Sequence, residues 1–301
     1  MDRLEAMSVL LAAVDAGSLS GASRKLGMPL ASVSRKVSEL ETHLRTQLLH
    51  RTSRRLTLTE AGRAYVAACK DILAGIEEAE RAAMGEYSAP RGDLTLSAPI
   101  AFGRLHVLPV VGAFLALHPD INVRMVLTDR IVNIVEEHFD LAIRIGELPD
   151  SSLVARRVGA THQVLCASPR YLAQHGTPEH PGDLARHSCI TFEGLASAQA
   201  WTFELGNKRE TVIIRSRLTV NTAEAAIDAA IASVGVTRVF SYQAAHAIHE
   251  GSLSVVLRAF EPAPSPISLV HGEQPRLPQK LRAFLDFAAP RLKATLLKNA
   301  V

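Results

Sequence analysis

The chain has 301 residues, 48% of them hydrophobic and 21% charged, with a net charge of +3; it is globular rather than disordered, and long enough for two or three domains. Three scattered cysteines (Cys69, Cys166 and Cys189) without a CxxC pattern argue against a disulfide framework, a zinc ribbon and a thioredoxin-like site. The N-terminus carries acids and lacks the form of a signal peptide, and no apolar run reaches the roughly 20 residues of a membrane span, so we expect a cytoplasmic protein without a membrane partner.

The first 44 residues predict three short helices. Apolar residues at helical spacing indicate a helix over residues 2–16, which Gly17 ends. Ser18 is placed to cap a second helix, and Pro29 suits the first position of a third helix that runs to Leu44. Two helices joined by a tight turn at Gly27, the second rich in small polar and basic residues, are typical of a helix-turn-helix.

The segment 50–58 predicts a two-stranded wing, and the charge of this region points to phosphates. Residues 1–59 hold nine basic and five acidic residues, whereas the rest of the chain holds 24 and 25. No Phe, Trp or Tyr occurs in 1–59, which favours double-stranded DNA over RNA or single strands. A solvated helix face is the alternative interpretation. The candidate DNA-contacting residues, beside the helix cation Lys36, are Leu30, Ala31, Ser32, Ser34, Arg35, Ser38, Arg51, Arg54 and Arg55.

Thr59 is placed to cap a long helix that carries one apolar stripe, and residues 88–92 follow as a linker. The stripe predicts pairing with the same helix of a second subunit; the alternative is packing against its own domain. Its members are Tyr65, Cys69, Ile72, Leu73, Ile76 and Met84. We therefore expect a DNA-binding domain at 1–59, a linker helix and hinge at 60–89, and a further domain at 90–301.

Beyond the linker, strands alternate with helices, which favours parallel, doubly wound sheets. We expect strands at 94–98, 121–127, 140–145, 153–158, 162–167, 200–204 and 211–220. We expect helices at 100–117 (interrupted near Pro109), 131–137, 222–232, 241–250 and 278–297.

Three sequence segments resemble those of a known family. The pattern LxxxxASVSRKVSELExxL (26–44), followed by LLHRTSRRLTLTEAG (48–62), resembles the N-terminal signature of the LysR-type transcriptional regulators, and FDLAIRIG (139–146) is typical of their C-terminal domain. The resemblance covers the whole chain. Three departures stand out: Pro29-Leu30 replaces the usual Ser-Gln, Arg45 the usual glycine, and Leu49 the usual phenylalanine.

The resemblance implies a ligand-responsive, non-enzymatic regulator whose effector domain is like a periplasmic binding protein, with subdomains at 90–160 plus 267–301 and at 161–266. We expect a small anionic effector, such as a carboxylate, to lie between them at strand ends and helix starts. The alternatives are a structural ion pair or subunit contact for Arg144 and ordinary capping for Ser97 and Asn221. The candidate effector residues are Ser97, Ala98, Pro99, Phe102, Arg144, Gly146, Asn221 and Thr222.

The family further implies a dimer of dimers, a partly palindromic T-N11-A promoter site and RNA polymerase as a partner. A solute-binding protein or an enzyme using the cleft competes with this interpretation, but we find no signal peptide, nucleophile motif or P-loop. His246 and His249 could share a metal, although surface histidines are favoured, and no metal or cofactor is expected. Cys166 and Cys189 are interpreted as buried, inert thiols rather than oxidant sensors.

Overall fold

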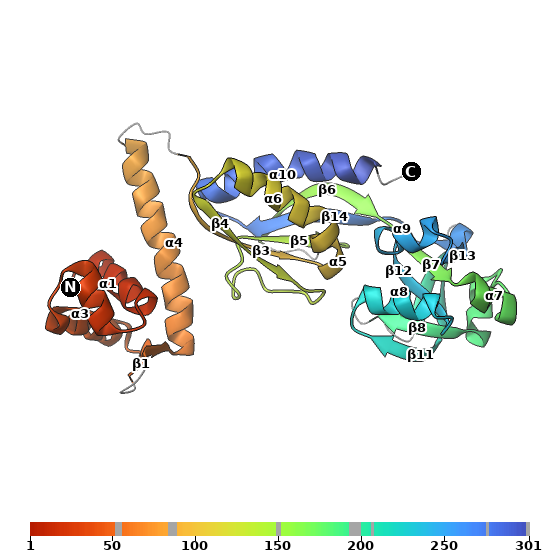
Figure 1. Cartoon of the computed structure of the whole chain (residues 1–301), viewed down its shortest axis with the longest axis horizontal. Coiled ribbons are helices and arrows are strands. Elements are labelled where there is room, and N and C mark those ends of the chain that lie inside the picture. Colours follow the sequence, from red (N-terminus) through yellow and green to blue (C-terminus); the bar gives the residue numbers. More distant parts are fainter. Residues whose placement is uncertain are drawn as a thin grey trace. The chain divides into compact units, whose positions relative to one another are not determined.

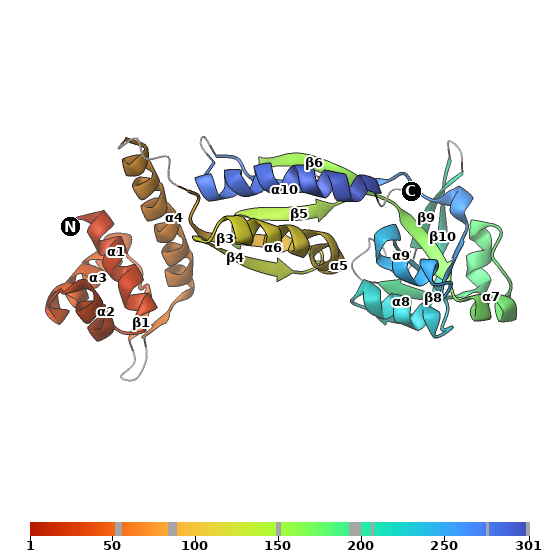
Figure 2. The same ribbon diagram turned by 45° about the horizontal axis from the view of Figure 1, so that its top comes forward.

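The computed structural model describes residues 1–51, 56–83, 89–148, 152–192, 200–205, 208–274 and 277–298. Its contacts divide the chain into two compact units, Met1–Ala89 and Pro90–Val301. Figures 1 and 2 show the elements of each unit.

Three short helices and their caps build the first unit as the sequence predicts. The Ser18 hydroxyl accepts a hydrogen bond from the Gly21 N–H at 3.0 Å, and Gly27 ends the second helix with φ of +63°. Pro29 is the residue before the third helix rather than its first residue, a small correction. The helices are α1 (Arg3–Asp15), α2 (Leu19–Leu26) and α3 (Leu30–Leu44).

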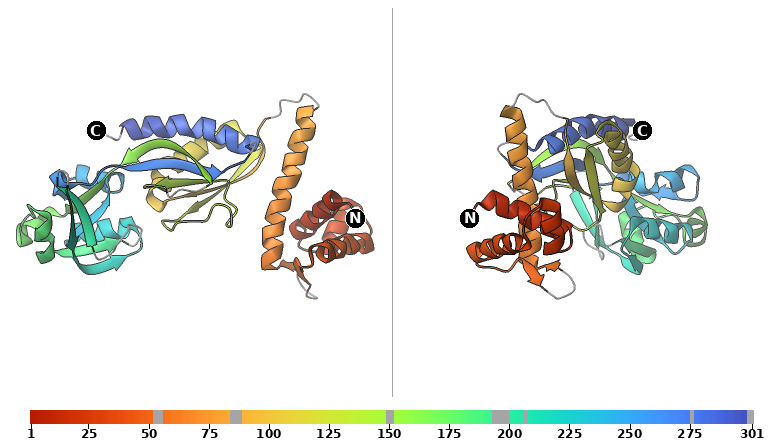
Figure 3. Two further views of the ribbon diagram at one scale, coloured as in Figure 1. Left: turned by 180° about the vertical axis from the view of Figure 1, so that it is seen from behind. Right: turned by 60° about the vertical axis from the view of Figure 1, so that its left-hand side comes forward.

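A two-stranded wing and a long helix complete this unit. Strand β1 (Leu49–Arg51) pairs antiparallel with β2 (Leu56–Leu58), and α4 (Glu60–Ala83) follows. The Thr59 hydroxyl accepts from the Gly62 N–H at 2.8 Å, which confirms the predicted cap. Figure 3 shows α4 running alongside the short helices.

The apolar stripe of α4 is divided between two environments. Tyr65 and Val66 pack into the core formed with α1, α2 and α3, and Cys69 is fully buried. Because no second subunit is needed to cover Cys69, the expectation that it pairs between subunits is wrong. Ile72 remains 45% exposed. Met84 lies outside the described residues.

The second unit contains two five-stranded sheets, and the first has the order β4-β3-β5-β14-β6. Helices α6 (Leu108–Leu117) and α10 (Gln279–Lys298) cover one face of it, and their apolar side chains form its core (Figure 1). The strands are β3 (Gly92–Ala98), β4 (Ile121–Leu127), β5 (Leu141–Ile145), β6 (Leu153–Thr161) and β14 (Ser265–Gly272).

The second sheet has the order β11-β8-β12-β7-β13. Helices α8 (Ala223–Ile231) and α9 (Ser241–His249) pack on one face (Figure 2), and the hairpin of β9 (Ala200–Leu205) and β10 (Lys208–Ile213) supplies side chains to the core on the other. The remaining elements are β7 (Gln163–Ala167), α7 (Pro169–His175), a 3-10 turn (Pro181–Arg186), β8 (Ser188–Phe192), β11 (Arg215–Val220), β12 (Val236–Phe240), β13 (Ser254–Val256) and a 3-10 turn (Arg258–Phe260).

The two-subdomain effector domain with sheets and packed helices is confirmed, but its sheets are mixed rather than parallel as the sequence predicts. In the first sheet β3 is parallel to β4 and β5, whereas β14 is antiparallel to both β5 and β6. The second sheet is likewise mixed, because β7 is antiparallel to β12 and β13. The reason is connectivity: β6 leads out of the first sheet and β14 leads back, so the two run side by side in opposite directions.

Three local expectations are also corrected. The helix expected at 131–137 is a series of turns, because the Asn133 side-chain oxygen accepts from the Val135 and Glu136 N–H groups at 3.2 Å. The strand expected at 211–220 is two strands, β10 and β11. The helix at 100–117 changes at Gly103–Val107, a π-helical turn between α5 (Ile100–Phe102) and α6, ahead of Pro109.

That same stretch, Ile100–Leu117, is the one helix among the described residues long and apolar enough to cross a membrane; α1 and α2 pass this test only together, with a 117° bend between them. Phe102, Val107, Val110, Val111 and Phe114 of this stretch lie in the core of the first sheet. Packing on both sheet and α10 accounts for its apolar composition.

Candidate functional site

Helix α3 presents a polar face to solvent because its apolar side chains anchor it to α1 and α2. Val33, Val37 and Leu40 are fully buried in the shared core. On the other side Leu30 is 49% exposed, Ala31 and Arg35 are exposed, and the predicted serines Ser32, Ser34 and Ser38 are half-buried. Six of the nine candidate DNA-contacting residues therefore lie on α3 and reach its surface.

The two cations in the middle of α3 differ in their surroundings. The Arg35 side chain is 71% exposed and lies 3.8 Å from Glu39 one turn away, a pair that solvent screens. Lys36 forms an ion pair with Glu5 of α1, and its side chain is only 18% exposed. Lys36 thus joins α3 to α1, and Arg35 is the cation available to a ligand.

The wing begins at a fixed place beside α3. The Glu41 carboxylate accepts hydrogen bonds from the backbone N–H groups of Leu48 and Leu49 at 2.9 and 3.1 Å. Arg51 belongs to β1, where its backbone is opposite Leu56. The predicted wing residues Arg54 and Arg55 lie outside the described residues.

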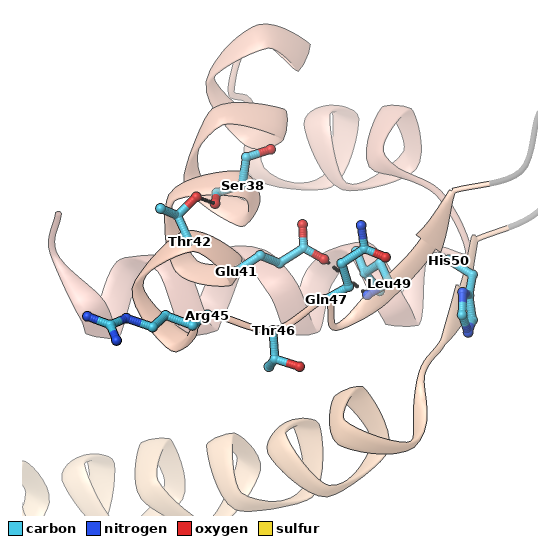
Figure 4. Close-up of a pocket in the computed structure, with 8 residues that line it drawn as sticks. All are labelled: Ser38, Glu41, Thr42, Arg45, Thr46, Gln47, Leu49 and His50. Carbon is cyan, nitrogen blue, oxygen red and sulfur yellow. Dashed lines mark hydrogen bonds between the residues drawn. The ribbon is translucent and has the colours of Figure 1, made fainter.

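A shallow groove, the α3–β1 groove, lies where α3 passes into the wing (Figure 4). Arg45 stands at its edge in the left-handed backbone region, with φ of +52°, where glycine would be less strained. The lining residues are Ser38, Glu41, Thr42, Arg45, Thr46, Gln47, Leu49 and His50. Polar side chains dominate this lining.

In the second unit, the candidate effector residues after β3 are largely covered. Ser97 and Ala98 are 4% and 1% exposed, and Phe102 is fully buried. Pro99 is half-buried at the start of α5. The Phe102 ring packs edge-on against Tyr242 of α9 at 5.5 Å, so this segment touches the second subdomain.

Arg144 is held within its own subdomain. Its guanidinium donates to the Val132 carbonyl, and burial lowers the pKa of this group. The neighbouring Arg130 and Glu137 pair with one another, which holds the pKa of the half-buried Glu137 at about 2. Gly146 follows β5 with φ of +114° and donates its N–H to the Pro266 carbonyl at 2.9 Å.

The start of α8 matches the expected capping. The Thr222 hydroxyl accepts from the Ala225 N–H at 3.3 Å, and Asn221 beside it is exposed. Glu224, in the first turn, lies 3.7 Å from Arg104 of the first subdomain. This ion pair brings the start of α8 and the α5 region together.

Sequence reasoning missed the titratable groups at this junction. Asp129 accepts from the Ile100 N–H at 3.1 Å; burial raises the pKa of Asp129, and the charge of Glu224 adds to it. His106, whose pKa burial lowers, packs against the Tyr242 ring at 5.5 Å. Asp129 follows a predicted strand and Glu224 opens a predicted helix, so the strand-end rule applied to every strand could have found them.

The remaining candidates behave as structural groups. Cys166 and Cys189 are buried as expected, and this burial raises the pKa of both thiols to about 12. The His246 side chain is 84% exposed and faces Glu250 at 3.4 Å. Within the described ranges, no three His, Cys, Asp or Glu side chains are placed to hold a metal ion.

Each of the two units matches a known protein family. Residues 4–63 match the family described as "Bacterial regulatory helix-turn-helix protein, lysR family", and residues 88–293 match "LysR substrate binding domain". Together the two matches span nearly the whole chain.

Individual relatives and solved structures are similar to this chain over nearly its full length. The chain is 32% identical to an uncharacterized HTH-type transcriptional regulator of Haemophilus influenzae (93% of this chain, 98% of the relative) and 34% to an HTH-type transcriptional repressor of Pseudomonas aeruginosa (95% and 91%). Among solved structures, CrgA of Neisseria meningitidis, a LysR-type transcriptional regulator, has a TM-score of 0.61 at 30% identity (96% and 98% covered). The Vibrio cholerae virulence activator AphB has a TM-score of 0.60 at 28% identity (95% and 98%).

Proposed function

The chain belongs to the LysR family of transcriptional regulators, and from this membership we propose that α3 reads double-stranded promoter DNA in the major groove. The family combines a helix-turn-helix with an effector-binding domain, binds promoter DNA and small molecules, and oligomerises. The observation that carries the proposal is the exposed polar face of α3, with Arg35 able to reach a base edge.

The base contacts are proposed for Ala31, Ser34 and Arg35, since the Leu30 side chain cannot hydrogen-bond a base. Arg51, Arg54 and Arg55 of the wing would neutralise flanking phosphates. The proposed target is a partly palindromic T-N11-A site, read by paired helices of an oligomer, and RNA polymerase is a proposed further partner. A regulator of this kind acts in the cytoplasm and is not an enzyme.

A gel shift with the DNA upstream of its own gene tests this function. We expect retardation that a specific competitor duplex abolishes and random DNA does not. A protein that binds a small molecule without retarding any duplex would favour the alternative, a small-molecule-binding protein or an enzyme that uses the cleft.

Oligomerisation is proposed to use the outer part of α4 alone. Ile72, Leu73 and Ile76 remain exposed or half-exposed after the first turns of α4 pack on their own unit. They lie at steps of one and three residues on one face, so a second α4 could cover them. A dimer of dimers would then require a further contact elsewhere.

The effector site is proposed between the subdomains 90–160 plus 267–301 and 161–266. The start of α8 offers unpaired backbone N–H groups and the positive end of a helix dipole, which suit a carboxylate. The Asp129 and Glu224 carboxylates lie close by, however, and would repel an anion. A bound anion must therefore also contact the Arg104 cation or a protonated Asp129. Ser97, Asn221 and Arg144 remain proposed contacts.

A thermal-shift screen of small carboxylates, repeated with Arg144→Ala, tests this part. The variant should keep DNA binding but lose the response to any ligand found. Unchanged ligand affinity would remove Arg144 from the site, and lost DNA binding without ligand would mark it as structural.

A further inference from the structure

The polar face of α3 continues beyond the candidate base-reading residues into the α3–β1 groove. Ser38, Thr42 and Arg45 follow Ala31 and Arg35 at steps of three and four residues, so all five lie along one stripe of the helix. The buried apolar residues of α3, Val33, Val37 and Leu40, point the other way. Whatever meets Arg35 is therefore directed toward Arg45.

The length of α3 decides what Arg45 meets. Its 15 residues span about 22 Å, whereas the major groove of B-DNA is only about 12 Å wide. A helix that enters the groove with its N-terminal half must carry its C-terminal end over the groove edge. The phosphate backbone forms that edge.

The charges at this end of α3 suit a phosphate only because of Arg45. A helix C-terminus is the negative end of the helix dipole and repels an anion by itself. Arg45 places a cation there, and within the described ranges no ion pair involves it. The one acid of the groove, Glu41, already accepts the N–H groups of Leu48 and Leu49.

The backbone of Arg45 adds a second observation. Its φ of +52° disfavours any L side chain, yet a long cationic side chain stands there. Figure 4 shows Thr46 beside Arg45 at one end of the groove and His50 at the other end, and both Thr46 and His50 are exposed. An exposed guanidinium with a hydroxyl-bearing residue next to it is the chemistry that proteins use to hold a DNA phosphate.

We propose that the Arg45 end of the α3–β1 groove holds a backbone phosphate of bound DNA, with Arg45 as its principal partner and Thr46 as a further donor. The inference rests on the proposed function, since it requires α3 to lie in the major groove. It adds a sequence-independent contact at the opposite end of α3 from the base-reading residues.

Replacing Arg45 separates a phosphate contact from a structural role, because the two predict opposite results. Arg45→Gly relieves the backbone strain and removes the cation, so the full-length variant should unfold at a higher temperature and yet bind DNA more weakly. Phosphate contacts are independent of sequence, so a short random-sequence duplex is a sufficient probe. Arg45→Lys keeps the charge, and Arg124→Ala, an exposed arginine of the second unit, controls for net charge.

Fluorescence anisotropy over a series of salt concentrations gives the decisive number. Each lost phosphate contact should reduce the slope of log K against log salt by about 0.9, or about eightfold in affinity near 0.1 M salt. Arg45→Gly should show this loss in each bound subunit, while Arg45→Lys and Arg124→Ala retain the slope. An unchanged slope in Arg45→Gly, or an equal loss in Arg124→Ala, overturns the inference.

Arg35→Ala measured in parallel distinguishes this failure from failure of the proposed function. Arg35→Ala is measured on both the promoter duplex and the random duplex. If Arg35→Ala loses its preference for the promoter duplex while Arg45→Gly binds both duplexes as the wild type does, only the phosphate contact is refuted. If neither variant changes binding, α3 is not the reading helix, and both proposals fail.

Discussion

Replacing Glu41 should destabilise the DNA-binding unit far more than replacing Glu39, two residues earlier on the same helix. The Glu41 carboxylate accepts the backbone N–H groups of Leu48 and Leu49 at 2.9 and 3.1 Å, and both of these residues are buried. Glu39 is exposed and only pairs with Arg35 across 3.8 Å. The two substitutions remove the same charge from very different surroundings.

The expected magnitudes follow from these contacts. A hydrogen bond to a charged group contributes about 1.5–3 kcal/mol, and an abandoned buried N–H adds a desolvation cost, so Glu41→Ala should cost about 3–5 kcal/mol. Glu41→Gln keeps a neutral acceptor and should cost about half as much. Glu39→Ala removes a screened surface pair worth about 0.3–0.5 kcal/mol.

Thermal unfolding with two probes isolates the effect. The single tryptophan, Trp201, lies in the second unit, so its fluorescence reports the unfolding of that unit and not of the first. Circular dichroism reports the loss of helix in both units. About 3 kcal/mol should lower the midpoint of the first unit by more than about 10 °C and leave the Trp201 transition in place. Equal midpoints for Glu41→Ala and Glu39→Ala would refute the role given to Glu41.

Three further predictions concern other parts of the chain. Ile72→Glu with Ile76→Glu places two unpaired charges on the outer face of α4 and should reduce the oligomer in sedimentation; a wild-type sedimentation profile would exclude that face. Burial lowers the pKa of His106, so its contribution to the stability of the second unit should be present above about pH 6.5 and lost as the pH falls toward the lower pKa of the folded state. His106→Gln should make this loss of stability smaller when unfolding is followed by Trp201 fluorescence. The same pH profile in the variant and the wild type would contradict this prediction. Cys166 and Cys189, with pKa values raised to about 12, should react with a thiol reagent at pH 8 only after denaturant is added; rapid labelling of the native protein would show that they are accessible.

The sequence predicts most where local signals decide the structure. Ser18, Gly27 and Thr59 mark helix ends through their own side-chain or backbone chemistry, and the structure places the ends there. The helix expected at 131–137 fails for the same local reason, since the Asn133 side chain binds the following N–H groups. The spacing of apolar residues does not reveal that the Asn133 side chain competes for the N–H groups that a helix would use.

Features that depend on distant pairing could not be predicted as well. Strand β14 was missed, although its neighbours β5 and β6 were expected, because a short apolar run identifies neither its type nor its partners. Which residues of the α4 stripe are buried depends on how α4 packs against α1 in the shared core. At the subdomain junction, Asp129, Glu224 and Tyr242 meet only after the chain has crossed between two sheets, so no spacing in the sequence joins them.

The central claim, that α3 reads double-stranded DNA, is tested most directly by footprinting the region upstream of the chain's own gene with the wild type and Arg35→Ala. The account predicts a protected, partly palindromic site for the wild type. For Arg35→Ala it predicts affinity lower by about 1–3 kcal/mol for each altered base contact, with relaxed preference at that base. The same footprint, with the same affinity and sequence preference for both proteins, would contradict it.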